Sequence, residues 1–178
     1  LGFVATGGDS MSTKLEEQLN VLFAERGASA SVMKGYGCTE MVSCAAFTQQ
    51  NCNAIGSVGI PLVKNNVKVI ELGTENELRY EEEGEICLCG PSMMKEYLDN
   101  RKATDDLIHI HADGHRWLHT GDVGYITEDG LIYIIGRVKR IMITVGADGQ
   151  PVKLFPDRIE KALLSHPSVS ACVAVGQA

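Results

Sequence analysis

The pattern of apolar residues changes at about residue 54, and this change constrains the fold more than any other feature of the chain. In residues 1–40, "LGFVATGG" is typical of a short buried strand, "STKLEEQLNVLFAERG" of a helix, and a second strand near residues 30–33 leads into "KGYGCTE". This β-α-β order favours parallel strands covered by a helix. From residue 54 onward the apolar runs are short and separated by turns. We therefore predict an α/β part followed by an antiparallel β part.

The predicted helix has two clear ends and one apolar stripe. Thr13 and Glu16 have the spacing of a capping box, and Gly27 marks the end of the helix. The apolar residues that recur at helical spacing are Leu15, Leu19, Leu22 and Phe23. We expect an amphipathic helix that packs through this stripe.

The second part is predicted to be a small β-barrel or sheet appended to the α/β part. Its β runs are "VKVIEL", "ELRY", "GEICLCG", "VGYIT" and "GLIYIIG", and Asp129-Gly130 between the last two favours a tight hairpin. The remaining segment, "GRVKRIMITVGADGQPVK", contains a basic turn and another strand. A helix that begins at Pro156 and a last strand, "VSACVAVG", follow it.

Composition and charge exclude several classes of function. The net charge is −7 and the lysines and arginines are scattered, so the chain lacks the basic surface that binds nucleic acid or anionic membranes. No apolar run reaches the roughly 18 residues that span a bilayer, and the N-terminus lacks the features of a signal peptide. The six cysteines show no C-x-x-C spacing, so we expect free thiols in a reducing, cytoplasmic compartment.

Residues 35–40, "GYGCTE", form a glycine-rich turn after a strand. Its two glycines let the backbone approach a flat ligand, on which Tyr36 can stack. Thr39 offers a hydroxyl donor, and Glu40 offers the hard oxygen that Mg²⁺ prefers. Glu40 occupies the place of the third glycine of a dinucleotide fingerprint, which excludes that motif. Taken alone, the segment is more often a structural turn.

Two further motifs carry groups that could bind a nucleotide. The turn Thr120-Gly121-Asp122 places a carboxylate that can accept hydrogen bonds from the vicinal hydroxyls of a ribose, although aspartate also caps such turns. In "IIGRVKR", Arg137 supplies a rigid fork of donors for ribose or phosphate oxygens, and Lys139 follows in a hinge or a solvated turn. Taken singly, the structural explanation is favoured for each motif.

Three histidines in "HIHADGH" could be imagined as metal ligands. They are His109, His111 and His115. We favour an ordinary loop over a metal site, because the resemblance described below aligns the segment with a variable exposed loop before the tryptophan-containing motif.

The ordered set of motifs resembles the adenylate-forming superfamily, which includes acyl-CoA synthetases, carrier-protein adenylation domains and luciferases. The stretches that carry the resemblance cover nearly the whole chain: "TGGDSM", "GYGCTE", "GSVGIPL", "GEICLCGPSMMKEYLDN", "WLHTGDVGYITEDGLIYIIGRVKR" and "KLFPDRIEKALLSHPSV". In this family a carboxylate attacks the α-phosphate of ATP, pyrophosphate leaves, and a thiol captures the acyl-adenylate. The resemblance implies an ATP-dependent, Mg²⁺-using ligase whose thiol is coenzyme A or a carrier protein.

The resemblance also implies roles for the first two motifs. The residues beside the adenine would be Gly8, Asp9 and Ser10. Tyr36 would stack on the base, with room made by Gly35 and Gly37. Thr39 would hydrogen-bond the α-phosphate, and Glu40 would hold the Mg²⁺ that neutralises the leaving pyrophosphate. Thr39 and Glu40 are therefore the candidate catalytic residues.

The later motifs would complete the site. Asp122, aimed into the pocket by Trp117 and the turn, would bind the ribose diol, and Arg137 would assist it. Lys139 falls where members of the family pivot a small C-terminal domain. We accordingly divide the chain into the end of an α/β subdomain (1–53), a small β-barrel subdomain of the same large domain (54–138), and a hinge with the start of a C-terminal α+β domain (139–178).

The sequence departs from the family pattern in several places. It contains neither the Ser/Thr/Gly-rich phosphate loop with its lysine nor the C-terminal lysine that contacts the reacting groups, and Asp9-Ser10 replaces a more typical Ala-Pro. It also begins within a strand pattern and without methionine, so we expect a piece of a longer ligase that is inactive alone. The alternatives are a carrier-protein adenylation domain and a non-catalytic nucleotide-binding or assembly module of the same fold.

Overall fold

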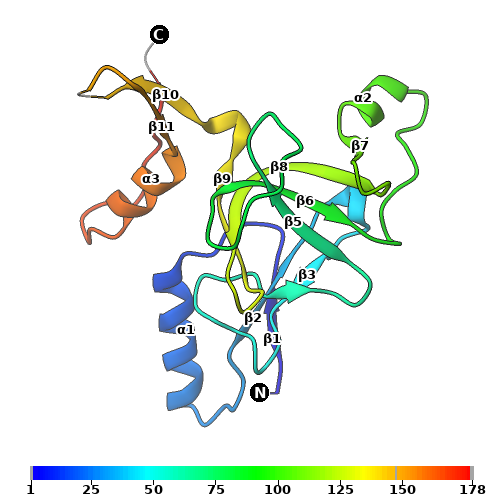
Figure 1. Cartoon of the computed structure of the whole chain (residues 1–178). Coiled ribbons are helices and arrows are strands. Elements are labelled where there is room, and N and C mark those ends of the chain that lie inside the picture. Colours follow the sequence, from blue (N-terminus) through cyan, green and yellow to red (C-terminus); the bar gives the residue numbers. More distant parts are fainter. Residues whose placement is uncertain (1, 147, 177–178) are drawn as a thin grey trace.

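Two sheets, a β-hairpin and three α-helices form the computed structural model, which describes residues 2–146 and 148–176 (Figure 1). Leu1, the first residue of the first predicted strand, lies outside this range. None of the described helices is both long and apolar enough to cross a membrane.

The first sheet is mixed and contains four strands in chain order. They are β1 (Val4–Thr6), β2 (Val32–Tyr36), β3 (Ala46–Phe47) and β4 (Ile60–Pro61). β1 and β2 are parallel and are connected by α1 (Thr13–Glu25), so the predicted β-α-β unit is confirmed. β3 and β4 continue the sheet with antiparallel pairing.

The N-terminus of α1 differs from the prediction. The N-cap is Ser12, whose Oγ accepts a hydrogen bond from the backbone N–H of Leu15 at 3.2 Å, and Thr13 is the first helical residue. The capping box predicted for Thr13 and Glu16 is therefore wrong. The helix starts one residue earlier than a cap at Thr13 would imply. The Glu16 side chain therefore faces β2, where it pairs with Lys34, and not the cap.

Helix α1 is joined to β2 by a buried ion pair. The side chain of Glu16 is fully buried; its Oε1 pairs with Lys34 Nζ, and its Oε2 accepts a hydrogen bond from the Gly56 N–H at 3.0 Å. Two members of the predicted apolar stripe, Leu15 and Leu22, keep 46% and 41% of their surface exposed. The Glu16–Lys34 ion pair thus anchors α1 on β2, whereas the sequence pattern predicted that the apolar stripe would do so.

The second sheet contains five antiparallel strands. They are β5 (Asn66–Ile70), β6 (Gly84–Cys89), β7 (Ile108–Ile110), β8 (Arg116–Ile126) and β9 (Ile132–Arg137). β5, β6 and β8 are neighbours in that order, while β7 and β9 pair with the two halves of β8. The run "ELRY" forms only an isolated bridge, Ile70 to Glu77. A short helix, α2 (Arg101–Asp105), precedes β7.

This sheet is open among the residues that the structure describes. β5 lies at one edge and β7 and β9 lie at the other, and no pairing joins the two edges. A closed barrel requires the first and last strands to pair, so the predicted β-barrel is not seen here. The predicted hairpin between β8 and β9 is present, with Gly130 at φ +81° donating to the Thr127 carbonyl at 2.8 Å.

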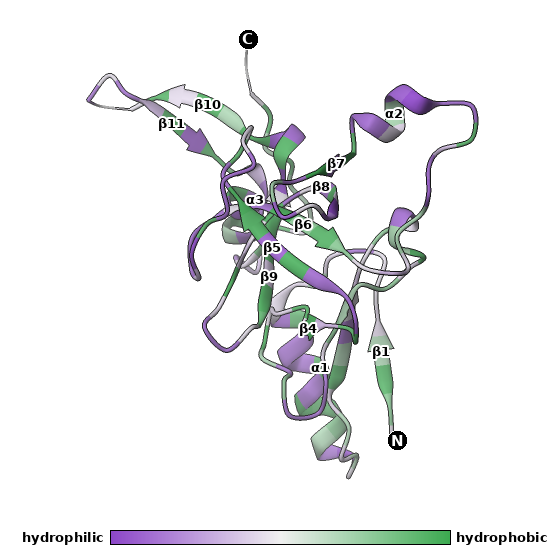
Figure 2. Ribbon diagram, turned by 45° about the vertical axis from the view of Figure 1, so that its right-hand side comes forward, coloured by the Kyte–Doolittle hydropathy of each residue, from purple (hydrophilic) through white to green (hydrophobic). Residues whose placement is uncertain are grey.

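The two faces of the antiparallel sheet carry different clusters. Its inner face joins residues from both sheets in the main core: Met41, Ala45, Ala46, Val69, Ile86, Leu88, Ile108, Leu118 and Ile132. Strand alternation turns a smaller cluster, Ile70, Cys87 and Trp117, to the other face. In Figure 2 the strands of this sheet are largely hydrophobic, whereas α2 is largely hydrophilic.

The chain leaves β9 through a short 3₁₀-helix, η2 (Val138–Arg140), and forms a separate hairpin of β10 (Met142–Val145) and β11 (Pro151–Leu154). α3 (Pro156–Leu164) follows, with Pro156 at its N-terminus as predicted. The last predicted strand, "VSACVAVG", is absent from the described residues, because the segment pairs with no strand and contacts Glu160 instead; the Ala174 N–H donates to Glu160 Oε1 at 2.8 Å.

Ion pairs hold α3 against the rest of the chain. Arg140 Nη1 lies 2.8 Å from Asp157 Oδ1, and Arg140 Nη2 lies 2.6 Å from Glu160 Oε1. Arg158 pairs with a carboxylate of the loop before β6. A side chain at Gly136 in β9 would approach Asp157 Oδ2 to 2.6 Å, so glycine permits this close approach.

Candidate functional site

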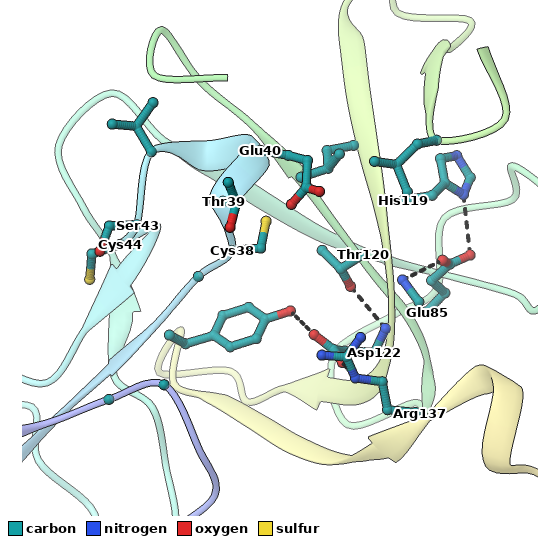
Figure 3. Close-up of a pocket in the computed structure, with 18 of the residues that line it drawn as sticks. Cys38, Thr39, Glu40, Ser43, Cys44, Glu85, His119, Thr120, Asp122 and Arg137 are labelled. Atoms are coloured by element: carbon teal, nitrogen blue, oxygen red, sulfur yellow. Dashed lines mark hydrogen bonds and ion pairs between the residues drawn. The ribbon is translucent and has the colours of Figure 1, made fainter. Parts of the chain in front are cut away.

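A cleft of 1490 Å³ opens where the end of β2 faces the middle of β8 and the end of β9 (Figure 3). A smaller hollow of 330 Å³ adjoins it beside the loop that follows β1. Every residue that the sequence predicts for the nucleotide site or the hinge lines one or both hollows: Gly8, Asp9, Ser10, Gly35, Tyr36, Gly37, Thr39, Glu40, Asp122, Arg137 and Lys139. The fold therefore brings these distant motifs together.

Asp122 is positioned by a bulge within β8. The residues of β8 on either side of the bulge pair with Cys87 and Glu85 of β6, so that residues 120–122 lie opposite a single residue of β6. Gly121 adopts φ +69°, a conformation that favours glycine. The sharp turn predicted here is thus a kink in one continuous strand.

Hydrogen bonds fix the shape of this bulge. Thr120 Oγ1 donates to the Ile86 carbonyl at 2.7 Å and accepts from the Asp122 N–H at 3.0 Å. Glu85 Oε1 accepts from the Gly121 N–H at 3.0 Å. These contacts satisfy the backbone groups that the bulge removes from the ladder, and they direct the Asp122 side chain into the cleft (Figure 3).

Trp117 does not aim Asp122, contrary to the interpretation of the sequence. Strand alternation places its side chain on the outer face of the sheet, where it packs with Ile70 and Cys87. Its indole Nε1 donates to Asp113 Oδ2 at 2.8 Å. The position of Asp122 therefore depends on the bulge and not on the tryptophan.

The Asp122 carboxylate has two partners within the protein. Its Oδ2 accepts a hydrogen bond from the Tyr36 hydroxyl at 2.7 Å, and its Oδ1 pairs with Arg137 Nε at 2.8 Å. Arg137 is the register partner of Asp122 in the β8–β9 ladder. Burial raises the pKa of Asp122, while the Tyr36 hydrogen bond and the Arg137 charge lower it. Burial and the nearby carboxylate raise the pKa of Tyr36, which keeps its hydroxyl a donor.

Gly35 and Gly37 make room for the chain itself. A side chain at Gly37 would meet the Ser43 carbonyl oxygen at 1.9 Å, and one at Gly35 would meet the Phe47 ring at 3.2 Å and Cys44 Sγ at 3.3 Å. Glycine is therefore required at both positions, as predicted. The reason differs, because the chain around β3, and not a ligand, occupies the space next to these glycines.

Thr39 and Glu40 lie on the other wall of the cleft, in the 3₁₀-helix η1 (Thr39–Met41). Glu40 Oε1 accepts a hydrogen bond from the Tyr97 hydroxyl, and the Glu40 carbonyl accepts from the Met94 N–H at 2.7 Å. The Tyr97 hydrogen bond lowers the pKa of Glu40, although partial burial opposes it. The sequence did not predict Tyr97, because it lies in an irregular segment far from Glu40 in the chain.

Replacing Tyr97 by phenylalanine is expected to raise the pKa of Glu40 toward its ordinary value. The hydrogen bond favours the charged carboxylate, so its stabilising effect is present at neutral pH and is lost as the pH falls through the Glu40 pKa. A ¹³C NMR titration of the side-chain carboxyl measures this directly. Tyr80→Phe, at a tyrosine that is 61% exposed, is the control. An unchanged Glu40 midpoint in Tyr97→Phe would contradict the assignment.

Comparisons with known proteins agree with the fold. The sequence profile of the family described as AMP-binding enzyme matches residues 1–98. The chain is 36% identical over 168 residues to luciferin 4-monooxygenase of Nipponoluciola cruciata, covering 93% of this chain and 28% of that protein. It is 37% identical over 163 residues to probable 4-coumarate–CoA ligase 3 of Dictyostelium discoideum, covering 91% and 28%.

Solved structures give the same result. o-Succinylbenzoate-CoA synthetase (MenE) from Bacillus subtilis, in complex with the acyl-adenylate OSB-AMP, has a TM-score of 0.75 and 30% identity, covering 94% of this chain and 31% of that one. ATP-bound MatB from Rhodopseudomonas palustris has a TM-score of 0.78 and 26% identity, covering 94% and 30%. The chain thus spans less than a third of the length of these relatives. The chain belongs to the AMP-binding family of adenylate-forming enzymes.

Proposed function

We propose that the protein containing this chain is an ATP-dependent carboxylate ligase. It joins an acid to ATP, forming an acyl-adenylate and pyrophosphate, and then transfers the acyl group to the thiol of coenzyme A. The observation that carries the proposal is the contact of Tyr36, Asp122 and Arg137 in a cleft that Glu40 also lines. Relatives named as 4-coumarate–CoA ligase and o-succinylbenzoate-CoA synthetase favour coenzyme A over a carrier protein.

The nucleoside would bind around Asp122. One oxygen of its carboxylate accepts a hydrogen bond from Tyr36 and the other is paired with Arg137. A carboxylate oxygen has two acceptor sites, so both oxygens can also receive the ribose hydroxyls. The ring of Tyr36 lines both hollows and offers a stacking face to the adenine. The loop containing Gly8, Asp9 and Ser10 lines the smaller hollow, which would take the base.

The phosphates would bind near Thr39 and Glu40. The lowered pKa of Glu40 keeps its carboxylate charged at neutral pH, and a charged carboxylate oxygen is a hard ligand that fits Mg²⁺. Bound there, Mg²⁺ would neutralise charge on the departing pyrophosphate. Tyr97 holds the Glu40 side chain in place, and the Thr39 hydroxyl is the donor we assign to the α-phosphate.

The proposal also assigns a role to each part of the chain. Residues 1–53 and 54–138 provide the nucleotide side of the site, and residues 139–178 belong to a domain that pivots at Lys139, which is exposed and lines the cleft. Because the sequence lacks the phosphate loop and the C-terminal lysine of the family pattern, the complete reaction would use residues outside this stretch.

Carboxylate-dependent exchange between ATP and labelled pyrophosphate tests the proposal. Short, medium, long and aromatic acids are supplied in turn to the purified protein, and coenzyme A or a phosphopantetheinylated carrier protein is then offered as acceptor. We expect exchange with one class of acid, followed by a CoA thioester. A folded protein that binds AMP but exchanges pyrophosphate with no acid would refute the ligase and establish the nucleotide-binding module.

A further inference from the structure

Three histidines converge on the outer face of the antiparallel sheet. They are His109, His111 and His119, here called the histidine cluster. In the β7–β8 ladder His109 lies opposite Trp117, and strand alternation places His111 and His119 on that same face. One nitrogen from each of the three rings lies within 4.8 Å of the other two. His115, which the sequence grouped with His109 and His111, is outside the cluster.

The rings of His111 and His119 face each other through their Nε2 atoms. His111 Nε2 and His119 Nε2 are 3.0 Å apart. His119 Nδ1 lies 3.2 Å from Glu85 Oε2, and because an ionised carboxylate only accepts, this nitrogen carries the proton. In the neutral ring the Nε2 of His119 therefore carries a lone pair that faces His111. The His109 ring stacks close by, 4.2 Å from His119 between ring centroids.

This spacing fits a single metal ion. Two imidazole nitrogens bound to one tetrahedral Zn²⁺ at about 2.0–2.1 Å lie about 3.3 Å apart. The observed separation of 3.0 Å is close to that value, and the third nitrogen completes a set of three imidazoles. Three protein ligands leave one position for water or another ligand, as in open zinc sites.

The groups around the cluster also suit a cation. Glu85 holds the Nδ1 of His119, and Glu75 Oε1 lies 3.9 Å from the Nδ1 of His109. A carboxylate that is hydrogen-bonded as Glu85 is orients a ligand histidine and increases its basicity. The nearby Lys68 is paired with Asp113 Oδ2 at 3.6 Å. A metal ion can reach the histidine cluster from solvent on the side of His109, whose side chain is 37% exposed.

We propose that His109, His111 and His119 bind one divalent transition-metal ion of the zinc class. Imidazole nitrogens favour such ions, whereas Mg²⁺ favours oxygen, so this site differs in chemistry from the one assigned to Glu40. The inference does not depend on the ligase proposal. It does bear on the nucleotide site, because His119 and Glu85 also line the cleft (Figure 3). Glu85 contacts both His119 and the Gly121 N–H in the bulge that positions Asp122.

Competition for Zn²⁺ against a chromophoric chelator tests the site, using purified protein without a polyhistidine tag. We expect one Zn²⁺ per chain and at least about tenfold weaker binding in His109→Gln and His111→Gln. His115→Gln, in the same loop but outside the cluster, and His166→Gln, in another part of the chain, should bind as the wild type does. Co²⁺ should give the visible bands of a tetrahedral site with nitrogen ligands and no thiolate charge-transfer band.

His109→Gln is the decisive variant, because His109 is partly exposed while His111 is only 4% exposed and its replacement can disturb folding. Circular dichroism confirms that each variant is folded. Three results would overturn the proposal: no Zn²⁺ binding by the folded wild type, equal affinity in His109→Gln and wild type, or a thiolate charge-transfer band with Co²⁺, which would assign the metal to cysteine.

Discussion

An Asp122→Ala variant of the protein is expected to lose ATP–pyrophosphate exchange by at least about 100-fold. The buried carboxylate is the acceptor that we assign to both ribose hydroxyls, and hydrogen bonds to a charged group contribute about 1.5–3 kcal/mol each. The substitution also removes the partner that fixes the Tyr36 hydroxyl and Arg137 Nε. The variant should therefore bind ATP more weakly and carry out the adenylation step more slowly.

The comparison variants separate charge from shape. Asp122→Asn keeps one acceptor oxygen but loses the negative charge, so its loss of exchange should be smaller than that of Asp122→Ala. Asp129→Ala, in the exposed hairpin that follows the same strand, should retain wild-type exchange. A folded Asp122→Ala protein whose exchange stays within about threefold of the wild type would show that Asp122 does not bind the ribose.

The second large effect concerns stability. Glu16→Ala is expected to lower the free energy of unfolding by about 3–5 kcal/mol, the usual cost of removing one partner of a buried ion pair. The side chains of Glu16 and Lys34 are 0% and 8% exposed, so the substitution leaves a buried ammonium group unpaired. It also removes the acceptor for the Gly56 N–H. Urea denaturation monitored by circular dichroism measures the loss.

Two variants control for other causes. Glu17→Ala, at the exposed neighbouring position, should change the free energy of unfolding by no more than about 0.5 kcal/mol. Replacing both Glu16 and Lys34 by methionine should restore most of the lost stability, because no charge is then left unpaired. If Glu16→Ala cost less than about 1 kcal/mol, the ion pair would not anchor α1.

Local patterns predicted much of the fold. The β-α-β order of the first 40 residues, the hairpin at Asp129-Gly130 and the helix that begins at Pro156 all depend on signals within a few residues of each other. The glycine-rich turn and the carboxylate of Asp122 were singled out for the same reason. Short-range chemistry thus singled out these groups of the cleft, whereas the family resemblance implied their roles and added Gly8, Asp9 and Ser10.

Long-range contacts account for what the sequence did not predict. Glu16 was interpreted as a capping residue because its partner, Lys34, comes from the next strand. The Tyr36–Asp122 and Glu40–Tyr97 hydrogen bonds join residues that are 86 and 57 positions apart, with no periodic signal between them. His119 was overlooked as a third member of the histidine cluster, since only the β7–β8 register brings it beside His109.

The attachment of α3 has a mechanical consequence. The helix contacts the sheet through the ion pairs of Arg140 and Arg158, and its residues Ile159, Leu163 and Leu164 remain 37–49% exposed. Partly exposed ion pairs contribute only about 0–1 kcal/mol each, since water and dissolved salt replace the lost partner. Opening the joint would therefore break mainly weak ion pairs, together with the packing of the buried Pro156. A joint of this kind suits the rotation that we propose for Lys139.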